Sequence, residues 1–387
     1  MLSREFAPER PKLAEPVEAT VDGDQAYVRI GTPPSYIRLG APAWSITRLL
    51  DGSRSVREVA HEAGCTEEQV RRLADQLGGG GLLEGSEAQQ ERHDSDVHRQ
   101  SVFFLKFTWH DPRALGTVYD VVRRWIPPRW FAALAATLCV AGAAACLLSW
   151  TSMISQAQEA VSWSQVWQVW PAILLRAVVH ELGHAFFCLS FGRSVAALGF
   201  GLYYFQPVAF TDVSDIWLLR RRWQRVLVHL GGPIVDVALL VASGVTVLAA
   251  SDGLVETFAA YLLLSTLVGA AAGFNPLLRS DGYFVLTELL REDDLRDRAL
   301  VLMATTAPWR LSVRDRTSAV LVTYGAVSFV YTLVIVGIGA NVASRFVLHT
   351  VLGFDALPQA VMWSLGAGIA LVLWTVMLRR ARNATLA

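Results

Sequence analysis

The sequence predicts a multi-span α-helical membrane protein, with about six transmembrane helices and a small winged-helix-like α+β domain ahead of them. Three observations support this fold class. Of the 387 residues, 53% are hydrophobic, and the mean hydropathy is +0.37, which is too apolar for an ordinary soluble enzyme. From Arg129 onward, apolar segments recur that are long enough to cross a bilayer. The residues before Arg129 show the mixed polar pattern of a soluble domain.

Residues 18–90 are predicted to form the small domain. The segments QAYVRI and SYIRLG alternate, and GTPP joins them as a hairpin. Three helices follow over APAWSITRLLDG, SVREVAHEAG and TEEQVRRLADQLGGGGLL, with Ser55 and Thr66 as expected N-caps. Residues 91–128 are predicted to be a linker and juxtamembrane segment, and residues 129–387 to be the membrane domain.

The predicted spans run near 129–150, 167–191, 227–250, 255–278, 318–340 and 359–378. Arginines gather before the first span and after the second, fourth and last, whereas the alternate loops hold almost none. Because positive residues favour the inner side of a membrane, both termini and residues 18–90 are expected in the cytoplasm. The expected location is a bacterial-type cytoplasmic membrane.

The second predicted span contains His180, Glu181 and His184. The two histidines are four residues apart and so share one helix face. This is the HExxH pattern, in which two imidazoles bind zinc and the glutamate is the general base. Each charged residue inside a span costs about 2.5–3.5 kcal/mol on insertion scales, and a dication compensates that cost. The alternative is two neutral histidines and a protonated glutamate packed against other polar helices.

A catalytic zinc site needs a third protein ligand, and the best candidate is Asp281 in GFNPLLRSDGYFVL. His184 precedes Arg193 by about 13 Å along the helix axis, and Asp281 lies beside Arg279. Both parts of the site are therefore expected in the cytoplasmic half of the bilayer. The alternative for Asp281 is a helix-end carboxylate paired with Arg279. Asp236 in the third span is expected to form buried hydrogen bonds near the site, whereas Asp215 is expected to be solvated.

On these residues, the chain resembles the site-2 protease family of intramembrane zinc metalloproteases. The resemblance covers about residues 165–290 and includes the HExxH motif, NPLLRSDG and GGPIVD. It implies that His180, His184 and Asp281 are zinc ligands, that Glu181 is the catalytic base and that Asn275 holds the substrate backbone or the oxyanion. In this family, a segment like GFGLYYFQPVAFTDVSDIW can form a hairpin that accepts the substrate as an added strand. An ordinary re-entrant loop is the alternative.

Residues 18–87 resemble the PqqD-like modules that bind leader peptides of ribosomally made, post-translationally modified peptides. The resemblance implies that a leader adds as a strand to the small sheet, in a groove against the third helix. A winged helix can also bind DNA, but this segment has seven Arg, no Lys and eleven Asp or Glu, a balance of 7 − 11 = −4. An acidic surface is a poor phosphate binder, so no nucleic-acid partner is expected. A purely structural cap is a further alternative.

The expected function is an intramembrane zinc endopeptidase that cleaves a peptide precursor by removing its leader. Its expected partners are a leader-containing precursor bound by residues 18–90 and membrane lipid, and its expected cofactor is Zn2+. One alternative is regulated intramembrane proteolysis of a membrane-anchored regulator of the anti-sigma-factor type. Another is a non-catalytic zinc-binding or peptide-binding membrane protein.

Overall fold

The computed structural model describes eleven continuous ranges and some helical residues between 133 and 148. The ranges are 9–31, 34–86, 97–101, 104–110, 113–125, 150–160, 163–203, 206–250, 253–306, 315–344 and 359–384. The chain divides into two compact units, Met1–Gly273 and Phe274–Ala387. Each unit is described by itself.

The first unit begins with the small α+β module. Its strands β1 (Val17–Asp22), β2 (Gln25–Ile30) and β3 (Ser35–Gly40) form an antiparallel sheet in the order β1-β2-β3. Helices α1 (Ala41–Thr47), α2 (Val56–Ala63) and α3 (Glu67–Gly79) follow. Ser55 and Thr66 cap α2 and α3 with capping boxes, as the sequence predicts.

One face of this sheet covers the core of the module. Val28 and Ile30 pack there in a buried cluster that includes Val59, Val70 and Leu83. Strand β1 is an addition to the prediction. Its valines Val17 and Val21 are 42% and 59% exposed, so VEATVD lacks a pattern that places its apolar residues inside.

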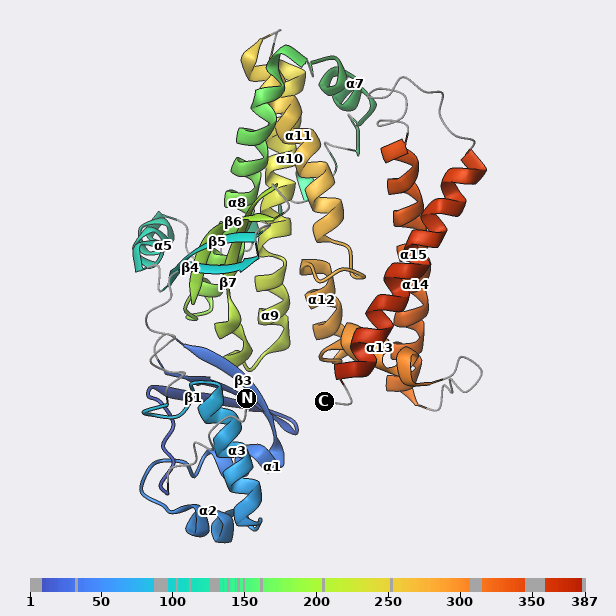
Figure 1. Ribbon diagram of the computed structural model, residues 1–387. Helices are drawn as coiled ribbons and strands as arrows, with labels where there is room; N and C mark the ends of the chain where they lie inside the picture. Colours follow the sequence, from blue (N-terminus) through green and yellow to red (C-terminus); the bar gives the residue numbers. More distant parts are fainter. Residues whose placement is uncertain are drawn as a thin grey trace. The chain divides into compact units, whose positions relative to one another are not determined.

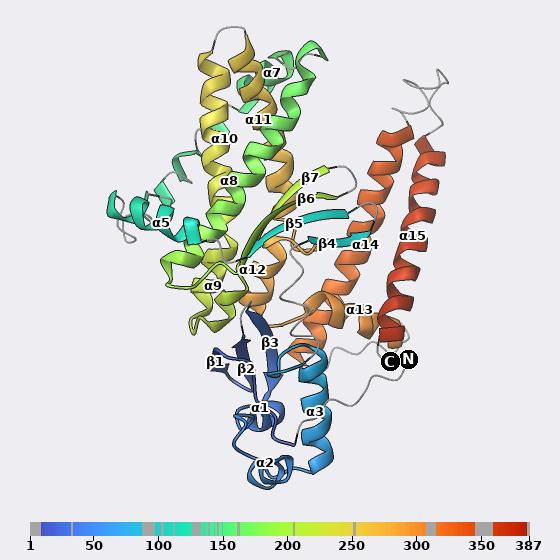
Figure 2. The ribbon, with the colours of Figure 1, turned by 60° about the vertical axis from the view of Figure 1, so that its left-hand side comes forward.

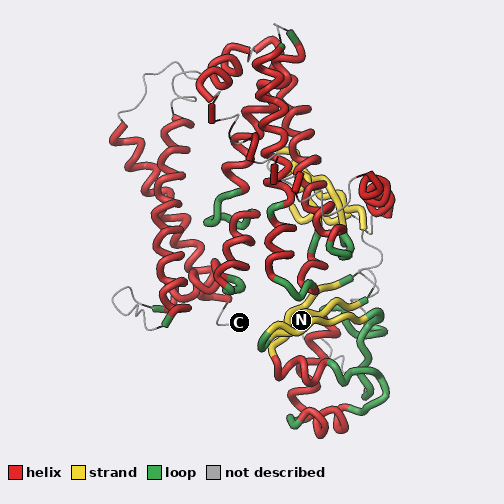
Figure 3. The backbone as a smooth tube through the Cα atoms, turned by 180° about the vertical axis from the view of Figure 1, so that it is seen from behind, coloured by secondary structure: helices red, strands yellow, loops and turns green. Residues whose placement is uncertain are grey.

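A second antiparallel sheet follows in the same unit. It contains β4 (Val97–Ser101), β5 (Phe104–His110), β6 (Ala197–Tyr203) and β7 (Gln206–Asp212), in the order β4-β5-β6-β7. Figure 3 shows the strands gathered in these two groups. The β6–β7 pair is the hairpin that the resemblance implies. Strands β4 and β5 lie in the segment that was expected to be a linker and juxtamembrane segment. Strand β5 pairs with residues 197–203, which are far beyond the reach of local patterns.

The remaining elements of the first unit are helical. They are α5 (Arg113–Trp125), α7 (Trp150–Ala160), the 3-10 turns η1 (Trp163–Gln168) and η2 (Ser214–Leu218), α8 (Val169–Ser190), α9 (Arg222–His229), α10 (Gly231–Ala249) and α11 (Leu254–Gly273). Helices α8, α10 and α11 lie side by side, and the second sheet lies beside α8 (Figures 1 and 2). Helices α8 and α10 cross closely at Gly183 and Gly231: a Cβ on Gly183 would lie 2.4 Å from the Gly231 carbonyl oxygen.

The second unit is helical in the part that the structure describes. It contains α12 (Asp281–Leu290), α13 (Leu295–Thr305), α14 (Arg316–Ser344) and α15 (Gln359–Ala384). A buried cluster of Tyr283, Leu295, Ala299, Leu321 and Tyr324 joins α12, α13 and α14.

Four helical segments are long and apolar enough to cross a membrane: Ser164–Ser190, Arg222–Ala249, Leu254–Gly273 and Arg316–Ile338. They match the second to fifth predicted spans. Half of the first predicted span, near 129–150, falls outside the described residues. The sixth coincides with α15, whose apolar part, Gly366–Arg379, is shorter than a span. The finding is a membrane protein with four candidate spans, while six spans and cytoplasmic termini stay predictions.

Candidate metal centre

Helix α8 holds His180 and His184 on one buried face, 8% and 6% exposed. His180 Nδ1 lies 2.9 Å from Asp236 Oδ2, and His184 Nδ1 lies 2.8 Å from the carbonyl oxygen of Val228. An ionised carboxylate and a carbonyl only accept hydrogen bonds, so the proton of each neutral ring belongs on Nδ1. This tautomer leaves a lone pair on each Nε2, which is the atom available for a metal.

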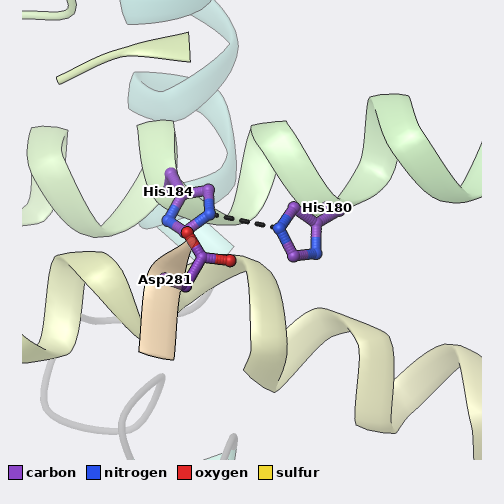
Figure 4. Close-up of side chains that lie close together, drawn as sticks. All are labelled: His180, His184 and Asp281. Atoms are coloured by element: carbon purple, nitrogen blue, oxygen red, sulfur yellow. Dashed lines mark hydrogen bonds between the residues drawn. The ribbon is translucent and has the colours of Figure 1, made fainter. Parts of the chain in front are cut away.

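The two Nε2 atoms face each other at 3.3 Å (Figure 4). Two nitrogens at about 2.0–2.1 Å from a tetrahedral zinc are about 3.3–3.4 Å apart. The observed separation therefore fits two ligands of one zinc ion. Two lone pairs facing each other also repel unless a cation or a proton lies between them.

Gly232 of α10 keeps the space beside these nitrogens open. A Cβ at this position would lie 2.4 Å from His180 Nε2 and 2.5 Å from His184 Nε2, so no larger residue fits without moving the rings. In the sequence, GGPIVD is visible only as part of a family resemblance. The structure gives its second glycine a physical reason.

Asp236 fixes the orientation of the His180 ring and is itself paired. Arg176 donates from Nε to Asp236 Oδ1 at 3.1 Å and from Nη2 to Oδ2 at 2.6 Å. Asp236 is 1% exposed, which confirms the expected buried hydrogen bonding. A carboxylate behind a metal-binding histidine holds the ring and raises its basicity. Sequence reasoning missed Arg176, although a lone arginine inside a predicted span was a usable signal.

Helix α11 makes room for the Arg176 guanidinium through Gly269. A Cβ on Gly269 would lie 2.2 Å from Arg176 Cζ. The chain Arg176–Asp236–His180 therefore depends on close contacts among α8, α10 and α11.

Asp281 is the first residue of α12 in the second unit. It therefore belongs to a different compact unit from His180 and His184. Because the two units are not placed relative to one another, the role of Asp281 as third ligand stays a prediction. Within the second unit, Arg279 pairs with Asp297.

Asn275 lies just before α12, and its side chain is engaged within the second unit. Its Nδ2 donates to the Tyr331 hydroxyl, and its Oδ1 accepts from the backbone N–H of Leu277 at 2.9 Å. These bonds shape the turn that leads to α12. The predicted role of Asn275 in holding substrate stays a prediction.

Glu181 lines an apolar cavity of about 430 Å³ between α8 and the second sheet. The Thr211 hydroxyl on β7 donates to the Glu181 carbonyl oxygen at 3.1 Å, which fixes β7 beside the HExxH motif. Glu181 follows His180 by one residue, so its side chain projects about 100° around the helix from that of His180. The carboxyl group is therefore placed between the histidine face and an open apolar space.

Within the first unit, the small module docks on the loop that carries a buried carboxylate, Asp215. Its oxygens accept from the Tyr36 hydroxyl at 3.0 Å, from Arg193 Nε at 2.9 Å, and from the Ser194 backbone and hydroxyl at 2.8 and 3.0 Å. Arg29 Nη1 lies 3.5 Å away. Asp215 is 1% exposed, so the expectation that it is solvated is wrong. A local sequence pattern cannot show that the module covers this loop.

A second group of contacts extends the docking surface toward α9. Asp22 Oδ2 accepts from Arg222 at 3.1 Å and from Arg225 at 3.3 Å. Tyr27 stacks on Trp217 with ring centroids 5.5 Å apart. Arg225 is 1% exposed, so part of the arginine-rich loop that indicated membrane orientation also forms this interface.

The docking carboxylates are held ionised. Burial alone raises the pKa of Asp215, but hydrogen bonds from Arg193 and Ser194 outweigh it and leave that pKa below its usual value. A hydrogen bond from Arg193 lowers the pKa of Glu18. Since Arg193 follows α8 by only three residues, the module is anchored at the end of the helix that carries both histidines.

Comparison with known proteins adds one distant relationship. A protein of Bacillus subtilis (strain 168) described as "Putative peptide zinc metalloprotease protein YydH" is 29% identical to the chain over 133 residues, which is 33% of the chain and 51% of that protein. The chain thus spans about half the length of this relative. No protein-family model and no solved structure matches the chain. The similarity supports a relationship to zinc metalloproteases and nothing narrower.

Proposed function

We propose that the protein is an intramembrane zinc endopeptidase that cleaves a peptide precursor and removes its leader. The observation that carries this proposal is the histidine pair, with both Nδ1 atoms engaged and both Nε2 atoms 3.3 Å apart. This donor geometry fits two ligands of one tetrahedral zinc ion. The similarity to a named zinc metalloprotease agrees with it.

The proposed site combines His180, His184 and Asp281 as ligands with Glu181 as the general base. A zinc ion held there would act as a Lewis acid that polarises the scissile carbonyl and lowers the pKa of water. Glu181 takes the proton from the attacking water and returns it to the leaving amide nitrogen. Arg176 and Asp236 hold the His180 ring in the orientation that directs Nε2 to the site.

The proposed substrate path uses the two sheets. Strand β7 has a neighbour on one side only among the described strands, so an extended peptide can pair with its other edge beside Glu181. In the small module, Glu18, Arg29 and Tyr36 lie opposite one another on neighbouring strands, on the face of the sheet that contacts Arg193 and Asp215. Strand β3 is likewise paired on one side only in the described part of the chain, and we propose this edge as the leader-binding strand.

Glu181→Gln tests the chemistry directly. The full-length protein in lipid nanodiscs is mixed with candidate leader-containing precursor peptides, and products are identified by mass spectrometry. We expect Glu181→Gln to keep its zinc and to lose about 10²- to 10⁴-fold in cleavage rate, the usual contribution of general acid–base catalysis. Glu159→Gln, an exposed change on α7, is the matched control and should cleave like the wild type.

Two results would contradict the proposal. Cleavage by Glu181→Gln at the wild-type rate would exclude Glu181 as the base. Equal KM values for a precursor and for the same peptide without its leader would exclude leader capture, because a captured leader raises the local concentration of the cleavage site.

A further inference from the structure

The face of the second sheet that looks toward α8 carries a row of aromatic residues that ends in a small residue. Phe107 on β5 is opposite Phe200 on β6, and Phe200 is opposite Ala209 on β7. Residues directly opposite in neighbouring strands share one face. Thr211, two residues after Ala209 and so on the same face, bonds to the Glu181 carbonyl, which identifies the face as the one beside α8.

This face and α8 enclose the cavity of about 430 Å³. Val178 and Leu182 of α8 line it together with Glu181, and Thr108 is the other polar residue among its lining residues. Phe107 and Phe200 remain 62% and 49% exposed, so the aromatic row is open on one side. The cavity therefore combines the proposed catalytic base with an uncovered apolar wall.

The depth of the cavity in the membrane limits what can cover the edge of β7. Glu181 lies nine residues before the end of α8, about 14 Å along its axis, inside a candidate span. Strand β7 has one neighbouring strand in the described part of the chain, and at such depth lipid tails cannot form hydrogen bonds to its backbone. An extended peptide supplies backbone partners as well as side chains, whereas lipid supplies only apolar contact.

We propose that the cavity is a specificity pocket, and that it takes a large apolar side chain, aromatic or branched aliphatic, next to the scissile bond of the substrate. The inference rests on the proposed protease function and names the class of peptide that this site prefers. A peptide strand paired with β7 places one side chain directly opposite Ala209, with Cβ atoms about 4.5–5.5 Å apart. That side chain extends the row Phe107–Phe200–Ala209 where the small Ala209 leaves room.

Ala209 is thus the specificity-determining residue. Its methyl group sets the free space at the end of the row, and a larger residue there would occupy the position of the substrate side chain. Gly199 supports the same sheet from the other face, because a Cβ there would lie 2.3 Å from the Phe210 ring.

The test compares wild type with Ala209→Phe in nanodiscs. The probes are synthetic peptides that are identical except for Phe, Leu, Ala or Gly at the one position next to the cleaved bond. We expect the wild type to cleave the Phe and Leu peptides at least about tenfold better in kcat/KM than the Ala peptide, within the range that apolar pockets reach. Ala209→Phe should lose that preference and keep its zinc. The milder Ala209→Val, expected to reduce the preference partially, replaces it if Ala209→Phe does not fold.

Ala249→Phe, an exposed change at the end of α10, is the matched control and should leave the preference unchanged. A second readout does not require turnover: in Glu181→Gln, a peptide with benzoylphenylalanine at the test position should crosslink to residues 107–109 or 198–200. Adding Ala209→Phe should abolish that crosslink.

The outcomes separate the two proposals. A wild type that crosslinks the peptide but cleaves none refutes the protease and keeps the pocket. Cleavage with an unchanged side-chain preference in Ala209→Phe, or crosslinks confined to other segments or to lipid, refutes the pocket and keeps the protease.

Discussion

Substitution of Gly232 by alanine tests the metal centre by adding one methyl group beside the two ring nitrogens, without removing any ligand atom. The added Cβ would lie 2.4 Å from His180 Nε2 and 2.5 Å from His184 Nε2. Those nitrogens are 3.3 Å apart, and a zinc ion lies about 2.0–2.1 Å from each ligand nitrogen. Zinc and the Cβ are both nearly equidistant from the two nitrogens. Their separation is therefore at most about 3.0 Å.

Relief of this contact requires the imidazoles to retreat by about 1 Å to reach ordinary van der Waals separation. A displacement of that size costs about 10²-fold where geometry is critical. We therefore expect Gly232→Ala to lower zinc affinity and cleavage about 100-fold or more, which is about 2.7 kcal/mol. The helical circular dichroism spectrum should remain.

Zinc affinity is measured by competition with a chromogenic chelator on purified full-length protein. Gly368→Ala in α15 is the matched control, because nothing lies within 4 Å of its Cβ position, and it should bind zinc like the wild type. Wild-type zinc affinity in Gly232→Ala would refute the assignment of the two Nε2 atoms as ligands.

Three further predictions concern the groups around the site. Asp236→Asn should lower zinc affinity by 10- to 100-fold, as loss of a carboxylate behind a ligand does. It should also lower the Tm, because Arg176 loses its buried partner. Adding Arg176→Gln to Asp236→Asn should restore the Tm but not the zinc affinity. Zinc should raise the Tm of the wild type over that of the chelated protein, and Asp281→Asn should reduce this rise, whereas an unchanged rise would exclude Asp281 as a ligand. Acid should release the module, because the folded-state pKa values of Asp215 and Glu18 are lowered. The two carboxylates therefore stabilise the docked module fully above their unfolded-state pKa values of 3.8 and 4.5. This stabilisation is lost as the pH falls through their folded-state pKa values. Protection factors of the β1–β3 amides, calculated relative to the intrinsic exchange rate at each pH, that are as high at pH 3 as at pH 7 would contradict the last prediction.

Local spacing explains why part of the site was visible in the sequence. His180, Glu181 and His184 lie within five residues on one helix, so helical periodicity alone brings both histidines to one face. The capped helices of the module were visible for the same reason, since Ser55 and Thr66 act on residues three positions away.

The remaining contacts are set by helix crossing and strand pairing between distant residues. Asp236 reaches His180 because α8 and α10 approach at Gly183 and Gly231, and composition gives no measure of that distance. Strand β5 was hidden because its partner β6 lies about 90 residues later. Asp215 was misjudged because its burial comes from a separate module.

The charges of the proposed site divide into two groups, each of which balances separately. Arg176 and Asp236 form one neutral pair inside the helical bundle. A divalent cation on His180 and His184 adds two positive charges, and the carboxylates of Glu181 and Asp281, with Asp281 as proposed, offer two negative charges.

An uncompensated charge at membrane depth costs about 2.5–3.5 kcal/mol on insertion scales. Without the cation, the two carboxylates must therefore take up protons or bear that cost. This balance favours a dication over a monovalent one, since a single positive charge leaves one carboxylate without compensation. The same charge balance explains why neutral imidazoles suit the site better than additional acidic ligands. The Asp236 carboxylate and the Val228 carbonyl fix the protons of these imidazoles on Nδ1. A third carboxylate in direct contact with zinc would make the loaded site negative inside the bilayer.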